Sequence, residues 1–217
     1  NPLVIPQFCL RFNDVDSVGL SGHFTGFVML GELAFMSLEK YDKDKYVSDY
    51  LTWLHEGMGL ANTDITIHED AWGGGGNFGC CLEFFSGGLE IGNQVYMTYY
   101  HDGKKLQPLQ IHVLDMGAGQ ERAAWFTQGK GTSYDATFPD VMQKLYERTG
   151  VQPDPSFQRA FMPYSSYLNM DEVEDADKTW GMVAKKLDMT IDQLKKKVLP
   201  LAALYSIADH TRSLLVT

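Results

Sequence analysis

The run of strand-like segments in the middle of the chain constrains its fold most. Apolar and β-branched residues gather around Ile65 and Ile67 and over residues 81–85 and 89–100, with only short turn sequences between them. Helical periodicity dominates the last third of the chain. Many consecutive strands followed by helices favour an α+β protein and argue against a repeating βαβ series. We therefore expect an antiparallel sheet flanked by helices, followed by a helical segment.

The first third of the chain predicts a hairpin and a helix. Residues 3–12 and 23–30 have strand composition, and the turn residues over 13–19 separate them, which predicts a long functional loop. Apolar residues at helical spacing predict a helix over 44–59. The segment 72–77, Trp-Gly-Gly-Gly-Gly-Asn, is expected to be a loop whose backbone approaches something closely. A hairpin turn is expected at Asp102-Gly103.

Four helices are expected after residue 120. They cover residues 123–128, 134–150, 170–187 and 191–216, the third of these starting at Met170. Gly150 is expected to cap the second helix, and Pro200 is expected to break the last one. Residues 151–155 are the expected linker between two domains, 1–150 and 151–217.

Composition excludes several classes of protein. No apolar run is long enough to cross a bilayer, and the first residues lack the pattern of a signal peptide. The net charge of −10 argues against nonspecific binding to polyanions. A basic stretch near residues 185–197 is best interpreted as a solvated helix face. The cysteines Cys9, Cys80 and Cys81 make a poor disulfide framework, so we expect a reducing cytoplasm.

Two arginines stand in contexts that suit a phosphate ligand. Asp115 is followed by Gly117, Gly119 and Arg122, and the two glycines allow a strand to turn closely over a ligand into a helix that carries the arginine. Asp115 could then hold an ammonium group. Arg11 precedes an acidic loop, which suits a phosphate with a nearby cation or ribose. The alternative for the segment from Asp115 to Arg122 is a tight strand–helix turn with an ion pair. The alternative for Arg11 is an ordinary hairpin tip.

Other chemistries find little support in the sequence. The serines lie outside any G-x-S-x-G context, the histidines lack metal-site spacing, and no metal ligand is predicted. The glycines at 117 and 119 lack the βαβ context of a dinucleotide fingerprint. Taken by themselves, the polar residues Asp209, His210 and Arg212 indicate only a polar helix face.

The order of these pieces resembles the class II aminoacyl-tRNA synthetases, and within them the alanine-specific enzymes of the archaeal type. The resemblance runs almost the whole length of the chain, and its combination of motifs is specific. The matching stretches are residues 1–5, 9–19, 72–79, 88–90, 115–122, 125–136 and 200–212.

The resemblance implies a site for ATP. Arg11 and Arg122 match the arginines that contact the ATP phosphates and act in catalysis, and Phe27 matches an aromatic residue that stacks on adenine. Asp14 and Gly119 complete the implied ATP-binding set. The reaction implied is attack of an amino acid carboxylate on the α-phosphate, with Mg²⁺ as the accompanying cation.

The resemblance also implies an amino acid site and a tRNA site. Asp115 matches the acid that binds the amino group of alanine, and Trp72, Asn93 and Gly117 match residues around that pocket. The implied tRNA-binding residues are Asp209, His210 and Arg212. The implied partners are alanine, ATP and tRNA(Ala), together with an upstream motif and an editing domain that lie outside this sequence or on a partner chain.

Four positions depart from the family pattern, and one of them is Cys80, which stands where the family has a proline. Gly22 and Val28 replace charged residues around the return strand, and Phe78 replaces a small residue in the glycine-rich segment. These changes leave an alternative function open, namely a synthetase-like paralogue or a non-catalytic module that binds an adenylate, an amino acid or RNA.

Overall fold

The computed structural model describes residues 2–168 and 175–217. The chain forms two compact units, each described separately below. The sheet unit comprises residues 1–7 and Val28–Ala123, and the helical unit comprises Phe8–Phe27 and Ala124–Thr217. The boundaries of these units do not fall at residue 150. The domain boundary expected there stays a prediction.

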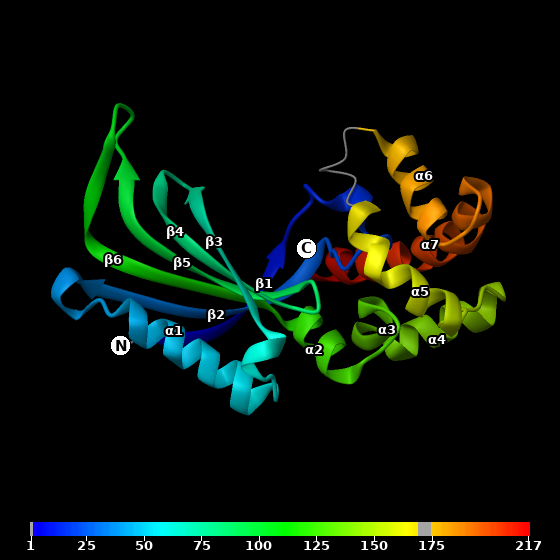
Figure 1. Ribbon diagram of the computed structural model, residues 1–217, viewed down its shortest axis with the longest axis horizontal. Helices are drawn as coiled ribbons and strands as arrows, with labels where there is room; N and C mark the ends of the chain where they lie inside the picture. Colours follow the sequence, from blue (N-terminus) through cyan, green and yellow to red (C-terminus); the bar gives the residue numbers. More distant parts are fainter. Residues whose placement is uncertain (1, 169–174) are drawn as a thin grey trace. The chain divides into compact units, whose positions relative to one another are not determined.

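An antiparallel sheet of order β1-β2-β6-β5-β4-β3 dominates the described part of the chain (Figure 1). The pairs β2–β6, β3–β4, β4–β5 and β5–β6 are antiparallel. The predicted α+β class with an antiparallel sheet is therefore confirmed. The strands are β1 (Leu3–Leu10), β2 (Gly26–Ser37), β3 (Thr66–Gly74), β4 (Asn77–Ser86), β5 (Leu89–His101) and β6 (Leu106–Gly119).

The expectation for the glycine-rich segment is mostly wrong. Trp72 and the two glycines after it belong to β3, and only Gly75 and Gly76 form the turn to β4. Their φ angles of 57° and 83° are left-handed, as a two-residue hairpin requires. Nothing lies within 4 Å of a Cβ built at either glycine, and the Gly76 carbonyl accepts a hydrogen bond from the His101 amide at 2.8 Å, at the end of the neighbouring strand.

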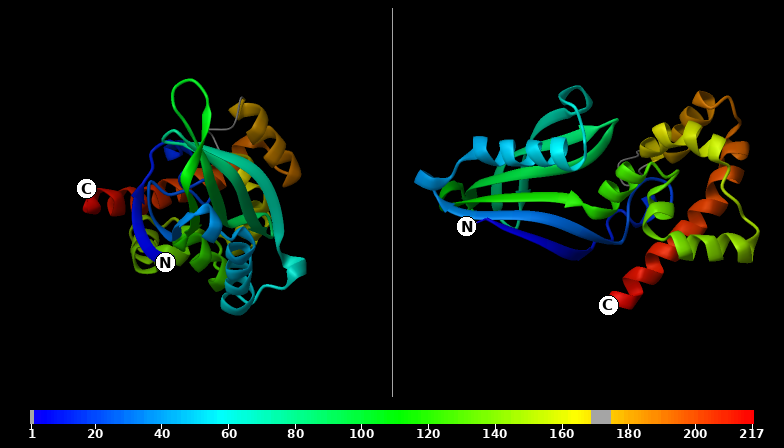
Figure 2. Two further views of the ribbon diagram at one scale, coloured as in Figure 1. Left: turned by 90° about the vertical axis from the view of Figure 1, so that its left-hand side faces the viewer. Right: turned by 90° about the horizontal axis from the view of Figure 1, so that it is seen from below.

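Helix α1 (Lys43–Thr52) covers one face of the sheet (Figure 2). It is capped by Asp42, whose carboxylate accepts a hydrogen bond from the Lys45 amide, and it continues as a π-helical turn over Trp53–Gly57. Tyr46 packs on Tyr96 and Leu114 of the sheet. The expected helix over 44–59 is therefore confirmed. Short 3-10 turns occupy Val15–Ser17, Leu38–Lys40, Asn62–Asp64 and Ser166–Leu168.

The helices that follow β6 are α2 (Gln120–Gln128), α3 (Ser133–Thr137), α4 (Pro139–Thr149), α5 (Pro155–Ser165), α6 (Ala176–Lys186) and α7 (Ile191–Val216). The start of the helix expected at 170 lies outside the described residues. Buried side chains of α3, α4 and α7 form one core of the helical unit, and those of α5, α6 and α7 form another. None of the described helices is long and apolar enough to cross a membrane.

Two helix boundaries differ from the expectation. The helix expected over 134–150 is two helices, because Phe138 leaves helical geometry and Pro139 starts α4. Gly150 ends α4 in the left-handed conformation, as expected. The predicted break at Pro200 is wrong, because α7 runs through it. Pro200 and Lys196 lie on the exposed side of α7, so water can bond the carbonyl that loses its N–H partner.

Candidate functional site

Strand alternation divides the sheet unit into a face covered by α1 and the opposite face. Leu114 and Tyr96 contact α1, so the neighbouring positions Asp115 and Val95, which pair with each other, face the opposite side. The next pair on that side is Gly117 with Asn93. The sheet register therefore brings together three residues that the sequence predicted to bind an amino acid.

Asp115 is a half-buried carboxylate without a hydrogen-bond or ion-pair partner among the described residues. Burial raises its pKa above the usual aspartate value, because desolvation disfavours the charged form. The neighbours that pair with it, Leu33 and Val95, are apolar and offer it no donor. A cationic group brought by a ligand would supply the missing partner.

Gly117 places no side chain beside Asp115. A Cβ built there would lie 2.9 Å from the sulfur of Met29 and 3.7 Å from Oδ1 of Asn93. The Met29 side chain therefore packs over this position, and glycine is the residue that fits beneath it.

Arg122, Glu90 and Asn93 form a hydrogen-bonded chain in the sheet unit. Arg122 lies in the first turn of α2, directly after Gly119 ends β6. Its Nη1 lies 2.9 Å from Oε2 of Glu90, and the Asn93 amide donates to Oε1 of the same carboxylate at 3.2 Å. The two oxygens of Glu90 therefore link the predicted phosphate-binding arginine to the predicted amino acid site. Nη2 and Nε of Arg122 have no protein partner within the described residues, and about a quarter of this side chain is exposed.

Glu121 is a site-supporting residue that the sequence analysis missed. Its side chain is buried, and both carboxylate oxygens lie 3.2 Å from the Val28 amide nitrogen. The contact uses the backbone of Val28, so the departure from the family pattern at that position leaves it intact. The signal was present in the sequence as the acidic residue directly before Arg122.

Trp72 and Phe78 are not placed beside Asp115. Trp72 lies on β3, about 14 Å from β6 at three strand spacings. A Cβ at Gly74 would fall within 2.4 Å of its indole ring, so the ring leans toward the β3–β4 turn. Phe78 pairs with Tyr99, four residues along β5 from Val95. That separation is about 13 Å in an extended strand, so Phe78 does not narrow the surface next to Asp115.

In the helical unit, Arg11 and Phe27 contact each other. The exposed guanidinium of Arg11 lies 5.4 Å from the centroid of the Phe27 ring, within cation–π range. The Arg11 amide donates to the Thr25 carbonyl at 2.8 Å, which joins the two sides of the loop. Asp14 starts the 3-10 turn of this loop without a side-chain capping bond.

The residues predicted to bind tRNA have different exposures. Asp209 is fully buried and bonds Thr25, and its carboxylate is inaccessible to a macromolecule in this structure. Arg212 donates to the Gly26 carbonyl and lies 4.8 Å from the Phe138 ring centroid. His210 has a side chain that is 43% exposed, with Nδ1 3.0 Å from the Asp209 carboxylate. Of these three residues, Asp209 is the one that is fully buried, whereas His210 and Arg212 are partly exposed.

Gly22 lies against the ring of Trp125. A Cβ on Gly22 would lie 3.3 Å from that ring, a tight contact that a small shift of the indole would relieve. Trp125 is itself held by a hydrogen bond of 2.9 Å from its Nε1 to the Lys130 carbonyl.

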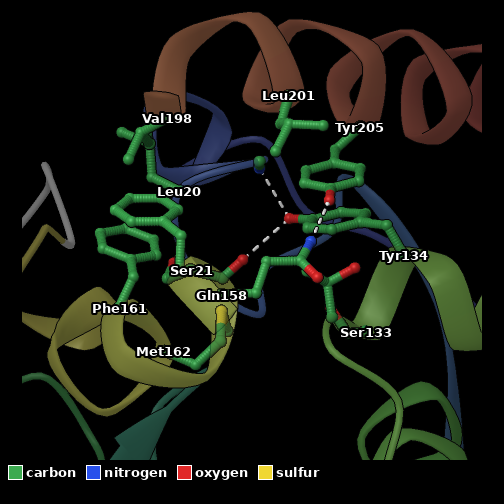
Figure 3. A pocket seen from close by; sticks show the side chains of 13 residues that line it. Leu20, Ser21, Ser133, Tyr134, Gln158, Phe161, Met162, Val198, Leu201 and Tyr205 are labelled. Atoms are coloured by element: carbon green, nitrogen blue, oxygen red, sulfur yellow. Dashed lines mark hydrogen bonds between the residues drawn. The ribbon is translucent and has the colours of Figure 1, made fainter. Parts of the chain in front are cut away.

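A small cavity lies in the helical unit around Tyr134 (Figure 3). Its volume of about 30 Å³ suits one or two water molecules and no organic substrate. Gln158 donates to the Tyr205 hydroxyl at its edge at 3.0 Å. This cavity therefore belongs to the packing of the helices.

The remaining candidate nucleophiles and metal ligands are dispersed or inert. Cys81 is buried, which raises its pKa to about 11 and keeps the thiol protonated. Within the described part of the chain, no group of three or more histidine, cysteine or carboxylate side chains could hold a metal ion.

Comparisons with known proteins agree with this geometry. A family model for tRNA synthetases class II (A) matches residues 1–217. The alanine–tRNA ligase of Methanocella arvoryzae is 50% identical over 97% of this chain and 25% of its own length. That of Nitrosopumilus maritimus is 38% identical over 99% of this chain and 24% of its own. The chain thus spans about a quarter of these curated relatives.

Among solved structures, pyrrolysyl-tRNA synthetase from Desulfitobacterium hafniense matches 63% of this chain and 45% of its own, with 14% identity and a TM-score of 0.43. The family match over residues 1–217 is the decisive comparison, and it agrees with the antiparallel sheet. The chain belongs to the tRNA synthetases class II (A).

Proposed function

We propose that this chain is the activating part of an alanine–tRNA ligase, which joins alanine to AMP and then transfers it to tRNA(Ala). The observation that carries the proposal is Asp115, a half-buried carboxylate that has no hydrogen-bond or ion-pair partner among the described residues. The names of the curated relatives support alanine as the amino acid.

Asp115 and its neighbours suit the amino group of a small amino acid. The ammonium group would pair with the Asp115 carboxylate, because a partly desolvated ion pair with hydrogen bonds is stronger than one in water. Asn93 offers an amide on the adjacent strand, and Gly117 adds no side chain of its own next to it. Leu33 and Val95 present apolar surface to a short aliphatic side chain.

Arg122 suits a phosphate of ATP. Its guanidinium is anchored by Glu90 through one nitrogen, and the donors that remain can bond a polyphosphate chain. Arg11 and Phe27 are proposed to contact the α-phosphate and the adenine, and Asp14 and Gly119 complete this proposed set. Magnesium is proposed to enter with ATP, because Mg²⁺ is commonly held by substrate phosphates with few protein ligands.

The proposed reaction needs no protein nucleophile. A carboxylate oxygen of alanine attacks the α-phosphorus of ATP, a new P–O bond forms, and the bond to the bridging oxygen breaks. Pyrophosphate leaves with that electron pair, and alanyl-adenylate remains. Mg²⁺ supplies neutralisation of phosphate charge, while the residues of this chain hold the two substrates in line and stabilise the developing charge.

The alternative of a non-catalytic module depends on three of the departures from the family pattern. The Val28 backbone keeps its contact with Glu121, Phe78 lies away from Asp115, and the structure does not explain Gly22. The enzyme is therefore the better proposal. The tRNA partner, a role for Trp72 in alanine binding, other segments or chains, and a cytoplasmic location stay predictions.

Amino acid-dependent ATP–pyrophosphate exchange tests the proposal. We expect exchange with alanine, weaker exchange with glycine and serine, and loss of exchange in Arg122→Ala. Exchange that is equal for all three amino acids would refute the alanine assignment. ATP binding by calorimetry with no exchange would favour the binding module.

A further inference from the structure

One stripe of helix α7 holds the loop that carries Arg11 and Phe27. Ala202, Ser206, Asp209 and Ser213 recur at the spacing of a single helix face. All four contact the segment between Val18 and Gly26, and all lie within the helical unit. Asp209, on this stripe, is one of the residues that the family resemblance implied to bind tRNA.

The first part of the stripe fixes the tip of the loop. Gly19 has a left-handed φ of 84°, and a Cβ there would lie 2.5 Å from the Ala202 carbonyl oxygen. Ser206 donates to the Val18 carbonyl at 3.3 Å. Tyr134, from α3, accepts a hydrogen bond from the Gly19 amide at 2.7 Å and lies next to the carbonyl of Ser21, as Figure 3 shows.

The second part of the stripe fixes the start of the return strand. The Asp209 carboxylate accepts from the Thr25 amide at 3.1 Å and from the Thr25 hydroxyl at 2.5 Å. Ser213 shares a hydrogen bond of 2.7 Å with the same hydroxyl. Arg212 donates to the carbonyl of Gly26, the next residue along.

The Asp209 side chain is fully buried, so its role follows from its contacts inside the protein. A buried carboxylate is tolerated where donors surround it, and here Thr25 and His210 provide them. The link to the proposed ATP site passes through Thr25. The Thr25 carbonyl accepts the Arg11 amide at 2.8 Å, and Phe27 follows two residues later.

We propose that Asp209 is a positioning residue for alanine activation, acting through Thr25 to place Arg11 and Phe27. The proposal rests on the proposed function for the role of Arg11, and on the geometry alone for the link from Asp209 to Arg11. It replaces a tRNA-contacting role for Asp209 with one in the step that uses ATP.

Two pairs of variants test this role in the whole chain. Asp209→Asn removes the carboxylate, and Asp192→Asn, at an exposed position of the same helix, is its control. Thr25→Val removes the hydroxyl with little change of volume, and Thr25→Ser restores it. The measurements are KM for ATP and for alanine, kcat in pyrophosphate exchange, and amide hydrogen exchange at Arg11, with amides of β5 as the internal standard for folding.

We expect Asp209→Asn to raise KM for ATP at least about tenfold, the effect of losing a charge-assisted contact, with KM for alanine nearly unchanged. Thr25→Val should also raise KM for ATP, and Thr25→Ser, which keeps the hydroxyl, should have a KM for ATP near that of the wild type. Amide protection at Arg11 should fall while that of β5 stays. Unchanged protection at Arg11, or lost protection with an unchanged KM for ATP, would overturn the proposal. If Asp209→Asn fails to fold, the Thr25 pair decides.

The same measurements separate the two proposals. A wild-type chain without ATP binding would refute the proposed function. Hydrogen exchange at Arg11 would still test the link from Asp209, because that measurement needs no substrate. Equal protection of the Arg11 amide in the wild type and in Thr25→Val would then refute the link from Asp209 to Arg11.

Discussion

Replacing Asp115 with asparagine should weaken alanine binding and stabilise the fold at the same time. In the wild type the carboxylate is half-buried and has no partner among the described residues, so its charge is a cost to folding that a bound ammonium group would offset. Asparagine keeps the shape and removes the charge. A residue with a merely structural role would lose stability on this change.

The size of the binding effect follows from the contact that is lost. A hydrogen bond to a charged group contributes about 1.5–3 kcal/mol. This corresponds to a rise in KM for alanine of about 10- to 150-fold. KM for ATP should change much less, because Arg122 and Glu90 keep their contact. The assay is pyrophosphate exchange at varied alanine, and Asp70→Asn is the control, because Asp70 is exposed on the same face of the sheet.

The stability effect has a definite dependence on pH. Burial raises the pKa of folded Asp115 above its value in the unfolded chain, so the folded state binds the proton more tightly. The wild type therefore loses stability as the pH rises through the interval between the two pKa values, and it carries the full penalty at neutral pH. Asp115→Asn should be the more stable protein at pH 7, and the difference should vanish at acid pH, where the wild-type carboxyl is protonated. Urea unfolding at both pH values measures this. A variant that binds alanine as the wild type does, or that is less stable at pH 7, would refute the reasoning.

Three further changes test other parts of the structure. Arg122→Ala should lower ATP affinity at least about tenfold by calorimetry, with little loss of fold; undiminished affinity would remove Arg122 from the site. Tyr134→Phe should cost about 1–3 kcal/mol in urea unfolding, because the buried amide of Gly19 loses its acceptor; an unchanged midpoint would contradict that. Pro200→Ala should stabilise α7 by up to about 3 kcal/mol, because it restores the missing N–H group; a lower melting temperature would show that the proline is needed.

Local patterns predicted most strands and helices, and they failed where distant packing decides. Pro200 was expected to break α7, but buried neighbours on either side, Val198 and Leu201, hold the helix together. The four glycines were expected to form one loop, but pairing with β4 draws two of them into β3. The strand order, with β6 between β2 and β5, depends on contacts far apart in sequence, which no local window contains.

The candidate site was predicted mainly by resemblance, and the sheet register adds a physical reason for part of it. Asp115, Asn93 and Gly117 are separated along the chain, yet pairing of β5 with β6 places them on one face. Glu90 was matched only as part of a motif, and its link between Arg122 and Asn93 became visible with the side chains in place. A sequence pattern gives residue types at a spacing, whereas a hydrogen-bonded chain depends on how strands pair.

The two aspartates show why residue type alone could not assign roles. Asp115 and Asp209 were both predicted to contact a substrate. Asp209 is fully buried and bonded by Thr25, so its charge is already compensated inside the protein. Asp115 is half-buried beside apolar neighbours, so its charge is compensated only when a cation arrives. Removing each charge should therefore shift stability in opposite directions, down for Asp209→Asn and up for Asp115→Asn. Unfolding of the two variants side by side at neutral pH distinguishes the carboxylate that organises the site from the one that binds the ligand.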